Sequence, residues 1–156
     1  MSKLISTFFY IGYLRPAPGT WGSLTALIIS FGIIQHSGIL LLIIAILFGF
    51  FIGWIAVAKQ TLNKRIHDPS EIVIDEVVGQ WIAVLPLALL PLNSGSSYAL
   101  WFMALIIFRV LDITKPGLIG WADRKNTPIS VMLDDLIAGA MTAAIIYLTF
   151  ILLKWI

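Results

Sequence analysis

The fold of this chain is decided by residues 39–58, which read ILLLIIAILFGFFIGWIAVA and contain no charged side chain. A helix needs about 20 mostly apolar residues to cross the ~30 Å hydrocarbon core of a bilayer, and this stretch has that length. The whole chain is also apolar, because 60% of its 156 residues are hydrophobic and only 12% are charged. Soluble globular domains carry roughly 25% charged residues. The composition therefore argues against a soluble enzyme, a disordered chain and a disulfide-rich secreted module, and predicts an integral membrane protein.

Three further apolar segments are expected to span the membrane, namely residues 72–92, 98–113 and 131–153. Residues 21–34 are also apolar, but as a helix they would rise only about 21 Å. We expect a re-entrant or half-spanning helix there, with a steep short span as the alternative. The runs are too long for strands and show no period of two. The predicted fold is all-α: residues 1–156 form one membrane-embedded domain, a bundle of four transmembrane helices plus a short N-terminal helix.

The basic residues indicate how this bundle is oriented. Nearly all the cations fall on one face of the predicted bundle, in Lys3, Arg15, the polar loop of residues 59–70 and the segment of residues 109–125. Lys154 alone falls on the other face. An excess of Lys and Arg marks the cytoplasmic side of a membrane protein. The net charge of only +2 does not indicate a nucleic-acid partner.

The acidic residues fall at the same cytoplasmic end, and they are Asp68, Glu71, Asp75, Glu76, Asp112, Asp123, Asp134 and Asp135. An Asp at the centre of a membrane helix costs roughly 2.5–3.5 kcal/mol, so such groups point inward and are paired or bound to a cation. Asp75–Glu76 and Asp134–Asp135 lie in the first turns of two predicted helices. Asp112 is three residues after Arg109, a spacing that allows an ion pair within one helix. Asp68, Glu71 and Asp75 share a helix face if that helix starts early enough.

These carboxylates predict a metal site beside an anion site. The chain has no Cys, and hard oxygen ligands select Mg²⁺, Ca²⁺ or Mn²⁺. The expected metal ligands are Asp75, Glu76, Asp134 and Asp135, and Asp112 joins them in the expected catalytic set. A second tier of supporting residues is His67, Asp68, Glu71 and Asp123. Side chains that could bind a phosphate are Arg15, Thr20, Arg109, Lys115 and Arg124.

Small residues at four-residue spacing indicate close helix packing. Gly49 and Gly53 form a G-x-x-x-G motif, and Gly139 and Ala143 repeat the spacing. We interpret these pairs as helix contacts rather than as a functional motif.

In three blocks the sequence resembles the phosphatidylglycerophosphatase A family. The first block is residues 12–23, GYLRPAPGTWGS. The second comprises His67-Asp68-Pro69 and residues 71–79, EIVIDEVVG. The third runs from Phe108-Arg109-Val110-Leu111-Asp112 through Lys115-Pro116 and Asp123-Arg124 to Met132-Leu133-Asp134-Asp135 and Ala138-Gly139. The resemblance implies a multi-pass enzyme of the bacterial inner membrane, with Mg²⁺ as cofactor and a phospholipid of the bilayer as substrate. It would remove the terminal phosphomonoester of phosphatidylglycerophosphate to give phosphatidylglycerol.

The residues and the resemblance point to the same chemistry, with some choices open. Carboxylates would hold the metal, and Arg109, Lys115 or Arg124 would share the developing negative charge. The nucleophile is either an activated water, which we favour, or an Asp that forms an aspartyl-phosphate. The alternative function is a cation transporter or channel subunit, because intramembrane carboxylates also mark ion pathways. A third interpretation, an assembly protein that uses the Gly motifs, leaves the acidic cluster without a role. The sequence leaves room for a homo-oligomer.

Overall fold

A computed structural model describes residues 1–62, 69–89 and 94–154, and in these ranges the chain is helical and contains no strand. Its elements in chain order are α1 (Ser2–Ser6), the 3-10 helix η1 (Ile11–Tyr13), α2 (Pro18–Thr61), α3 (Ile74–Ala83), the 3-10 helix η2 (Leu85–Ala88), α4 (Ser94–Thr114), α5 (Leu118–Asp123) and α6 (Pro128–Lys154). This confirms the predicted all-α fold class.

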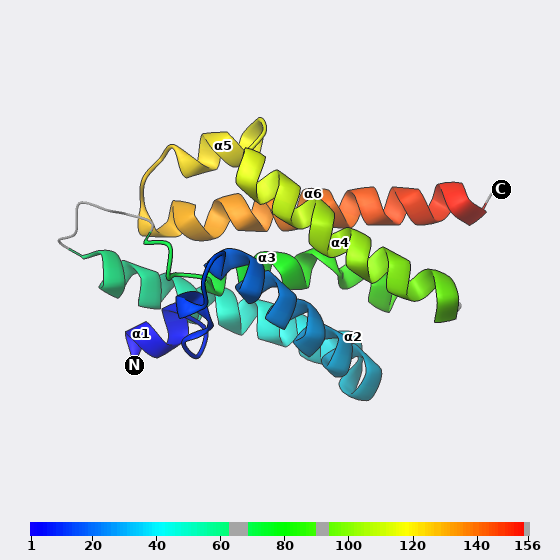
Figure 1. The fold of residues 1–156 in the computed structure, drawn as a ribbon, viewed down its shortest axis with the longest axis horizontal. Helices are drawn as coiled ribbons and strands as arrows, with labels where there is room; N and C mark the ends of the chain where they lie inside the picture. Colours follow the sequence, from blue (N-terminus) through cyan, green and yellow to red (C-terminus); the bar gives the residue numbers. More distant parts are fainter. Residues whose placement is uncertain (63–68, 90–93, 155–156) are drawn as a thin grey trace.

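Helix α2 is a hairpin of two arms. The break lies at Gly38, whose φ of 77° falls in the left-handed region that glycine adopts without steric cost. The chain reverses direction at this point, so that the arm of residues 18–37 and the arm of residues 39–61 run in opposite directions (Figure 1). Segment 21–34 lies inside the first arm, and the choice between a re-entrant helix and a short span stays a prediction.

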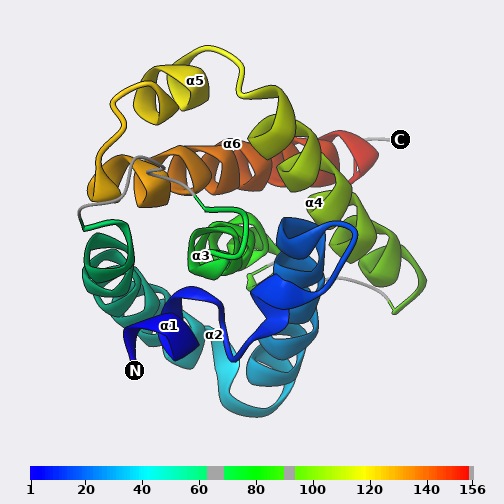
Figure 2. The same cartoon turned by 60° about the vertical axis from the view of Figure 1, so that its left-hand side comes forward.

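Helix α3 lies at the centre of the molecule, enclosed by both arms of α2, by α4 and by α6 (Figure 2). Glycines allow this close approach. A Cβ at Gly53 of the second arm would lie 3.0 Å from the Ile74 side chain, and one at Gly139 of α6 would lie 2.3 Å from the backbone oxygen of Gly79. On the first arm, the carbonyl of Ala26 accepts a hydrogen bond of 3.0 Å from the Trp81 indole. The interpretation of the Gly motifs as packing sites is thus confirmed for Gly53 and Gly139.

The expectation of four spanning helices is not confirmed. Segment 72–92 was expected to span, but it contains the short helix α3 of ten residues, followed by η2. Ten residues rise about 15 Å, half the thickness of the hydrocarbon core. Only α2 and α6 among the described helices are long and apolar enough to cross a membrane. The Pro at position 86 contributes to the early end of α3, because proline cannot donate the hydrogen bond of a continuing helix.

Both of these helices expose large apolar side chains. Phe48 and Phe51 on the second arm of α2 are 67% and 56% exposed, and Leu148 and Leu152 on α6 are 57% and 66% exposed. The core helix of a soluble protein would bury such residues. This surface, together with the length of α2 and α6, suggests a membrane protein.

Candidate active site

The first turn of α3 carries two of the predicted site residues, Asp75 and Glu76. The residues before them are held in place, since the backbone N–H of Val73 donates to the carbonyl of Ser6 at 2.9 Å. Ile74 packs in the apolar core on the side of α3 that meets Gly53. The carboxylate of Asp75 accepts a hydrogen bond of 3.1 Å from the backbone N–H of Glu76. Acidic side chains at this position complement the positive end of the helix dipole.

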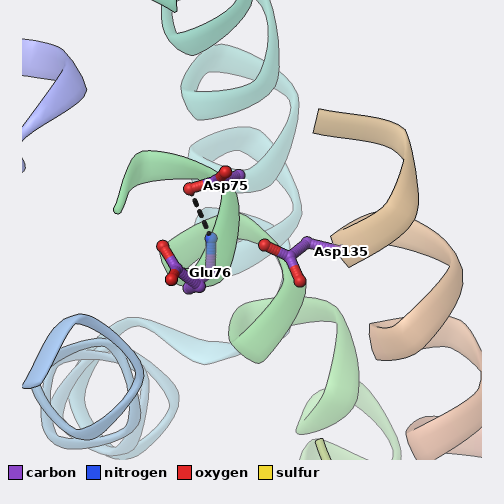
Figure 3. A group of neighbouring side chains, drawn as sticks. All are labelled: Asp75, Glu76 and Asp135. Atoms are coloured by element: carbon purple, nitrogen blue, oxygen red, sulfur yellow. Dashed lines mark hydrogen bonds between the residues drawn. The ribbon is translucent and has the colours of Figure 1, made fainter. Parts of the chain in front are cut away.

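Asp135 approaches these two carboxylates from α6, and the three residues form the acidic trio (Figure 3). One oxygen from each of the three side chains lies within 4.8 Å of the others. Asp75 and Asp135 are buried, at 5% and 3% exposure, and Glu76 is largely buried. Asp135 is brought here by the contact between α3 and α6, since a Cβ at Gly79 would lie 2.6 Å from its backbone oxygen.

The acidic trio fits a divalent cation. In the part of the chain that the structure describes, Oε2 of Glu76 and Oδ1 of Asp135 are buried without a hydrogen-bond partner. Buried carboxylates this close repel one another, and a bound cation removes both the repulsion and the cost of the unpaired oxygens. Three hard oxygen donors suit Mg²⁺, Mn²⁺ or Ca²⁺.

Arg109 of α4 supplies the adjacent positive charge. Its Nη1 lies 3.6 Å from Oε1 of Glu76 and also pairs with the carboxylate of Asp112. The start of α2 closes over this group, because a Cβ at Gly19 would lie 2.1 Å from Oε1 of Glu76 and 2.9 Å from Nη1 of Arg109. An arginine, the N-terminus of a long helix and the acidic trio therefore meet at one place, which is an arrangement that can bind a phosphate next to a metal ion.

Lys115 and Asp134 pair with each other near the acidic trio. The Lys115 ammonium donates to the carboxylate of Asp134 at 2.8 Å and also to Asp123, and so connects α5 to α6. Although burial lowers the pKa of Lys115, these two carboxylates outweigh it and raise that pKa above its ordinary value. Asp134 also accepts from the backbone N–H of Asp135 at 3.1 Å. The structure thus places Asp134 beside the acidic trio but not in it, and Lys115 is engaged by carboxylates.

The remaining predicted residues are not members of the acidic trio. Arg15, Thr20 and Arg124 are exposed. Glu71 precedes α3, which begins only at Ile74, so the condition for a helix face shared with Asp75 is not met. Its backbone instead lies against Gly12. His67 and Asp68 fall outside the described residues.

One buried polar residue was missed by the sequence reasoning. Gln80 of α3 is 0% exposed, and within the described residues neither its Oε1 nor its Nε2 has a hydrogen-bond partner. The signal available in the sequence was its spacing, because residue 80 is one helical turn after Glu76. Nothing in the sequence indicated that Gly19 lies close to Glu76, apart from the prediction that a helix starts near Gly19.

Known proteins are similar to this chain over most of its length. The family model for phosphatidylglycerophosphatase A matches residues 4–150. The Phosphatidylglycerophosphatase A of Haemophilus influenzae is 32% identical over 146 residues, which cover 92% of this chain and 85% of that protein. The protein of the same name from Escherichia coli is 32% identical over 145 residues, or 92% of this chain and 80% of its own.

A third relative has a different name. A Bacteroides thetaiotaomicron protein with the provisional name phosphatidylinositol-3-phosphatase is 32% identical over 146 residues, covering 92% of this chain and 89% of that protein. No solved structure gives a significant match. The family match over nearly the whole chain and the two relatives of the same name lead to one conclusion: this chain belongs to the phosphatidylglycerophosphatase A family.

Proposed function

We propose that this chain is a Mg²⁺-dependent phosphatase that converts phosphatidylglycerophosphate to phosphatidylglycerol and inorganic phosphate at the cytoplasmic surface of a bacterial inner membrane. The observation that carries the proposal is the acidic trio beside Arg109, in a chain of the phosphatidylglycerophosphatase A family. The family supplies the substrate class, and the trio supplies a place for the metal.

The membrane placement is supported by the surface of the two long helices. Exposed apolar residues on α2 and α6 would face lipid, while the starts of α3 and α6 bring the carboxylates to one end of the molecule (Figure 1). The exposed basic residues Arg15, Arg124 and Lys125 belong to segments at this end. A phospholipid presents its phosphate at the membrane surface, so a site at the end of a bundle meets the headgroup without drawing it into the hydrocarbon.

The side chains of the site would have different chemical roles. Asp75, Glu76 and Asp135 would hold the divalent cation, which when bound neutralises phosphate charge and lowers the pKa of a water ligand. Arg109 would bind the non-bridging oxygens of the phosphate and stabilise the charge that develops on them. The oxygen of water forms a bond to phosphorus, the ester bond to the glycerol oxygen breaks, and a proton passes to that glycerol oxygen. Burial of the trio keeps bulk water from competing for the cation.

The other candidate functions have unequal support. The name of the Bacteroides thetaiotaomicron relative makes phosphatidylinositol-3-phosphate a second substrate to test, because both lipids carry a phosphomonoester on a polyol headgroup that is joined to diacylglycerol. A cation transporter gains no support from the family match. In the described residues, the part of α6 that follows Asp135 has no charged residue before Lys154.

The test is phosphate release by the purified protein in nanodiscs. We expect release from phosphatidylglycerophosphate that is lost with EDTA and restored by Mg²⁺, with phosphatidylinositol-3-phosphate as the second substrate. Asp135→Asn should lower kcat at least 100-fold, since a metal site that loses one of three charged ligands binds weakly. Gln60→Met is the control, because Gln60 donates to Ser2 between α1 and α2, outside the site. Full activity in EDTA, or in Asp135→Asn, would refute the proposed metal site.

The proposed orientation has a separate test. The chain contains no Cys, so single cysteines can be introduced and labelled without a background. Lys125→Cys lies at the site end, and Ser37→Cys lies at the turn of α2, and both positions are exposed. In intact cells a membrane-impermeant maleimide should label Ser37→Cys and not Lys125→Cys. The reverse pattern would place the site outside the cytoplasm.

A further inference from the structure

Helix α3 carries a second polar group below the acidic trio. Gln80 follows Glu76 by one helical turn, and it is 0% exposed in the part of α3 that carries no charged side chain. Three polar atoms of these two side chains are buried and find no hydrogen-bond partner among the described residues: Oε2 of Glu76, Oε1 of Gln80 and Nε2 of Gln80. A fully buried carboxamide that satisfies neither of its polar atoms is rare in proteins.

Helix geometry directs Gln80 toward Glu76. Residues four apart lie on the same face, and helical side chains lean toward the N-terminus of their helix. The Gln80 side chain therefore extends along α3 toward the turn that holds Glu76.

The neighbouring first arm of α2 also carries a buried polar side chain, Ser23. The first arm of α2 starts at the same end as α3, with Gly19 against Glu76. One turn further along that arm, Ser23 is fully buried, and its hydroxyl donates to the carbonyl of Gly19 at 2.9 Å. In the described residues, Ser23 is thus buried with a hydrogen-bond partner, whereas neither polar atom of the Gln80 carboxamide has one.

The polarity of Gln80 is not needed for packing. A methionine side chain has nearly the same length and would fill the same space without any unpaired polar atom. Replacing a buried unsatisfied polar group by an apolar one of similar shape is neutral or stabilising. We therefore expect that the carboxamide of Gln80 serves to form hydrogen bonds and not only to fill space.

We propose that Gln80 is a positioning residue for Glu76, and that its carboxamide holds one buried water that donates to Oε2 of Glu76. A water in this place accepts from Nε2 of Gln80 and donates to the oxygens of both side chains, so it satisfies all three unpaired atoms. The hydrogen bond fixes the orientation in which the Glu76 carboxylate meets a divalent cation. The inference rests on the proposed function only in taking the acidic trio as a metal site.

The experiment measures metal binding directly, with Mn²⁺ as the probe. The free Mn²⁺ signal in electron paramagnetic resonance is titrated against the full-length protein in nanodiscs, and thermal unfolding is recorded on the same samples. Loss of a group that orients a metal ligand weakens metal binding about 10- to 100-fold, and a contact through water belongs at the lower end. We expect Gln80→Met to raise the Kd for Mn²⁺ about 10-fold while its Tm stays equal to that of the wild type or rises.

Two controls separate positioning from a structural role. Gln60→Met makes the same chemical change outside the site and should leave the Kd for Mn²⁺ unchanged. In a Glu76→Gln background, Gln80→Met should have no further effect on the Kd, because Gln80 acts through the Glu76 carboxylate. A Kd for Gln80→Met within two-fold of wild type, or an equal effect in both backgrounds, would overturn the inference.

The outcomes also separate this inference from the proposed function. If the wild type binds no Mn²⁺ and releases no phosphate, the acidic trio is not a metal site and both proposals fail. If the wild type does both and Gln80→Met binds Mn²⁺ equally well, only the role of Gln80 is refuted. A lower Tm for Gln80→Met together with weaker binding in both backgrounds would assign Gln80 to packing.

Discussion

Gly19→Ala is the substitution that tests most sharply whether the position of Glu76 matters. Gly19 is the second residue of α2, and a Cβ there would lie 2.1 Å from Oε1 of Glu76 and 2.9 Å from Nη1 of Arg109. Ordinary contact begins at 3.4 Å, so the Glu76 carboxylate must move by about 1.3 Å to make room. Movement in that direction also disturbs its 3.6 Å ion pair with Arg109.

The size of the effect follows from this displacement. Misplacing a catalytic group by about 1 Å can lower the rate about 100-fold, which corresponds to ~2.7 kcal/mol in the activation barrier. We therefore expect kcat/KM for phosphatidylglycerophosphate to fall by about two orders of magnitude in Gly19→Ala. The atoms in the clash are the ends of two side chains rather than backbone, so we expect the Tm to change little.

The assay is phosphate release in nanodiscs with thermal unfolding of the same preparation. Gly32→Ala is the matched control, because it makes the same change in the same arm of α2 and a Cβ there meets nothing within 4 Å. That variant should keep full activity and be slightly more stable, by about 0.5–1 kcal/mol. Combining Gly19→Ala with Glu76→Asp, which shortens the carboxylate arm, should not lower activity below that of Glu76→Asp alone. If Gly19→Ala keeps more than a third of wild-type activity, the position of the Glu76 carboxylate does not control the reaction.

Three further outcomes are expected. Gly139→Ala would place a Cβ 2.3 Å from the backbone oxygen of Gly79. Because backbone cannot move aside, the substitution should lower the free energy of unfolding by about 3 kcal/mol. An unchanged Tm would contradict the close contact of α3 and α6. Lys115→Met should cost about 1–2 kcal/mol, since it leaves the carboxylate of Asp134, 7% exposed, without its ammonium partner. The folded-state pKa of Lys115 is raised. The stability that the Lys115 ion pairs contribute is therefore complete below the ordinary Lys pKa of about 10.4, and it is lost only as the pH rises beyond that value. A loss of this stability between about pH 6 and 8 would refute the role of Lys115 in these ion pairs. Arg109→Lys keeps the charge but loses the planar fork, and should raise KM for the lipid about 10-fold with a smaller change in kcat; an unchanged KM would remove Arg109 from phosphate binding.

Part of the site was predictable because helix geometry acts over short sequence distances. Asp75 and Glu76 are adjacent in the first turn of α3, and Arg109 and Asp112 are three residues apart on α4, so both pairs could be placed from spacing alone. The choice between Asp134 and Asp135 could not be made in this way. Adjacent helical residues point about 100° apart, and which of them faces α3 depends on how α6 is rotated in the bundle.

Other features depend on packing and on contacts between distant segments, which spacing along the chain does not show. The phosphate role expected for Lys115 stays a prediction, and in the structure the turn into α5 brings Asp123 close enough to share the Lys115 ammonium with Asp134. Segment 72–92 was expected to span because its composition is apolar. It is apolar because α3 lies in the centre of the molecule, where both arms of α2 and α6 surround it, and a centrally buried helix has the same composition as a spanning one.

The sequence alone predicted a helical chain that is rich in apolar residues, with its carboxylates and nearly all of its cations at one end. These properties follow from composition and from the helical repeat, which depend on neighbours along the chain. Only the tertiary structure decided which carboxylates form the acidic trio, that Gly19 closes over Glu76, and that Gln80 lies buried beneath it. The physical reason is that these contacts join α2, α3, α4 and α6, and the rotation and separation of helices are set by the glycines and side chains that fit between them.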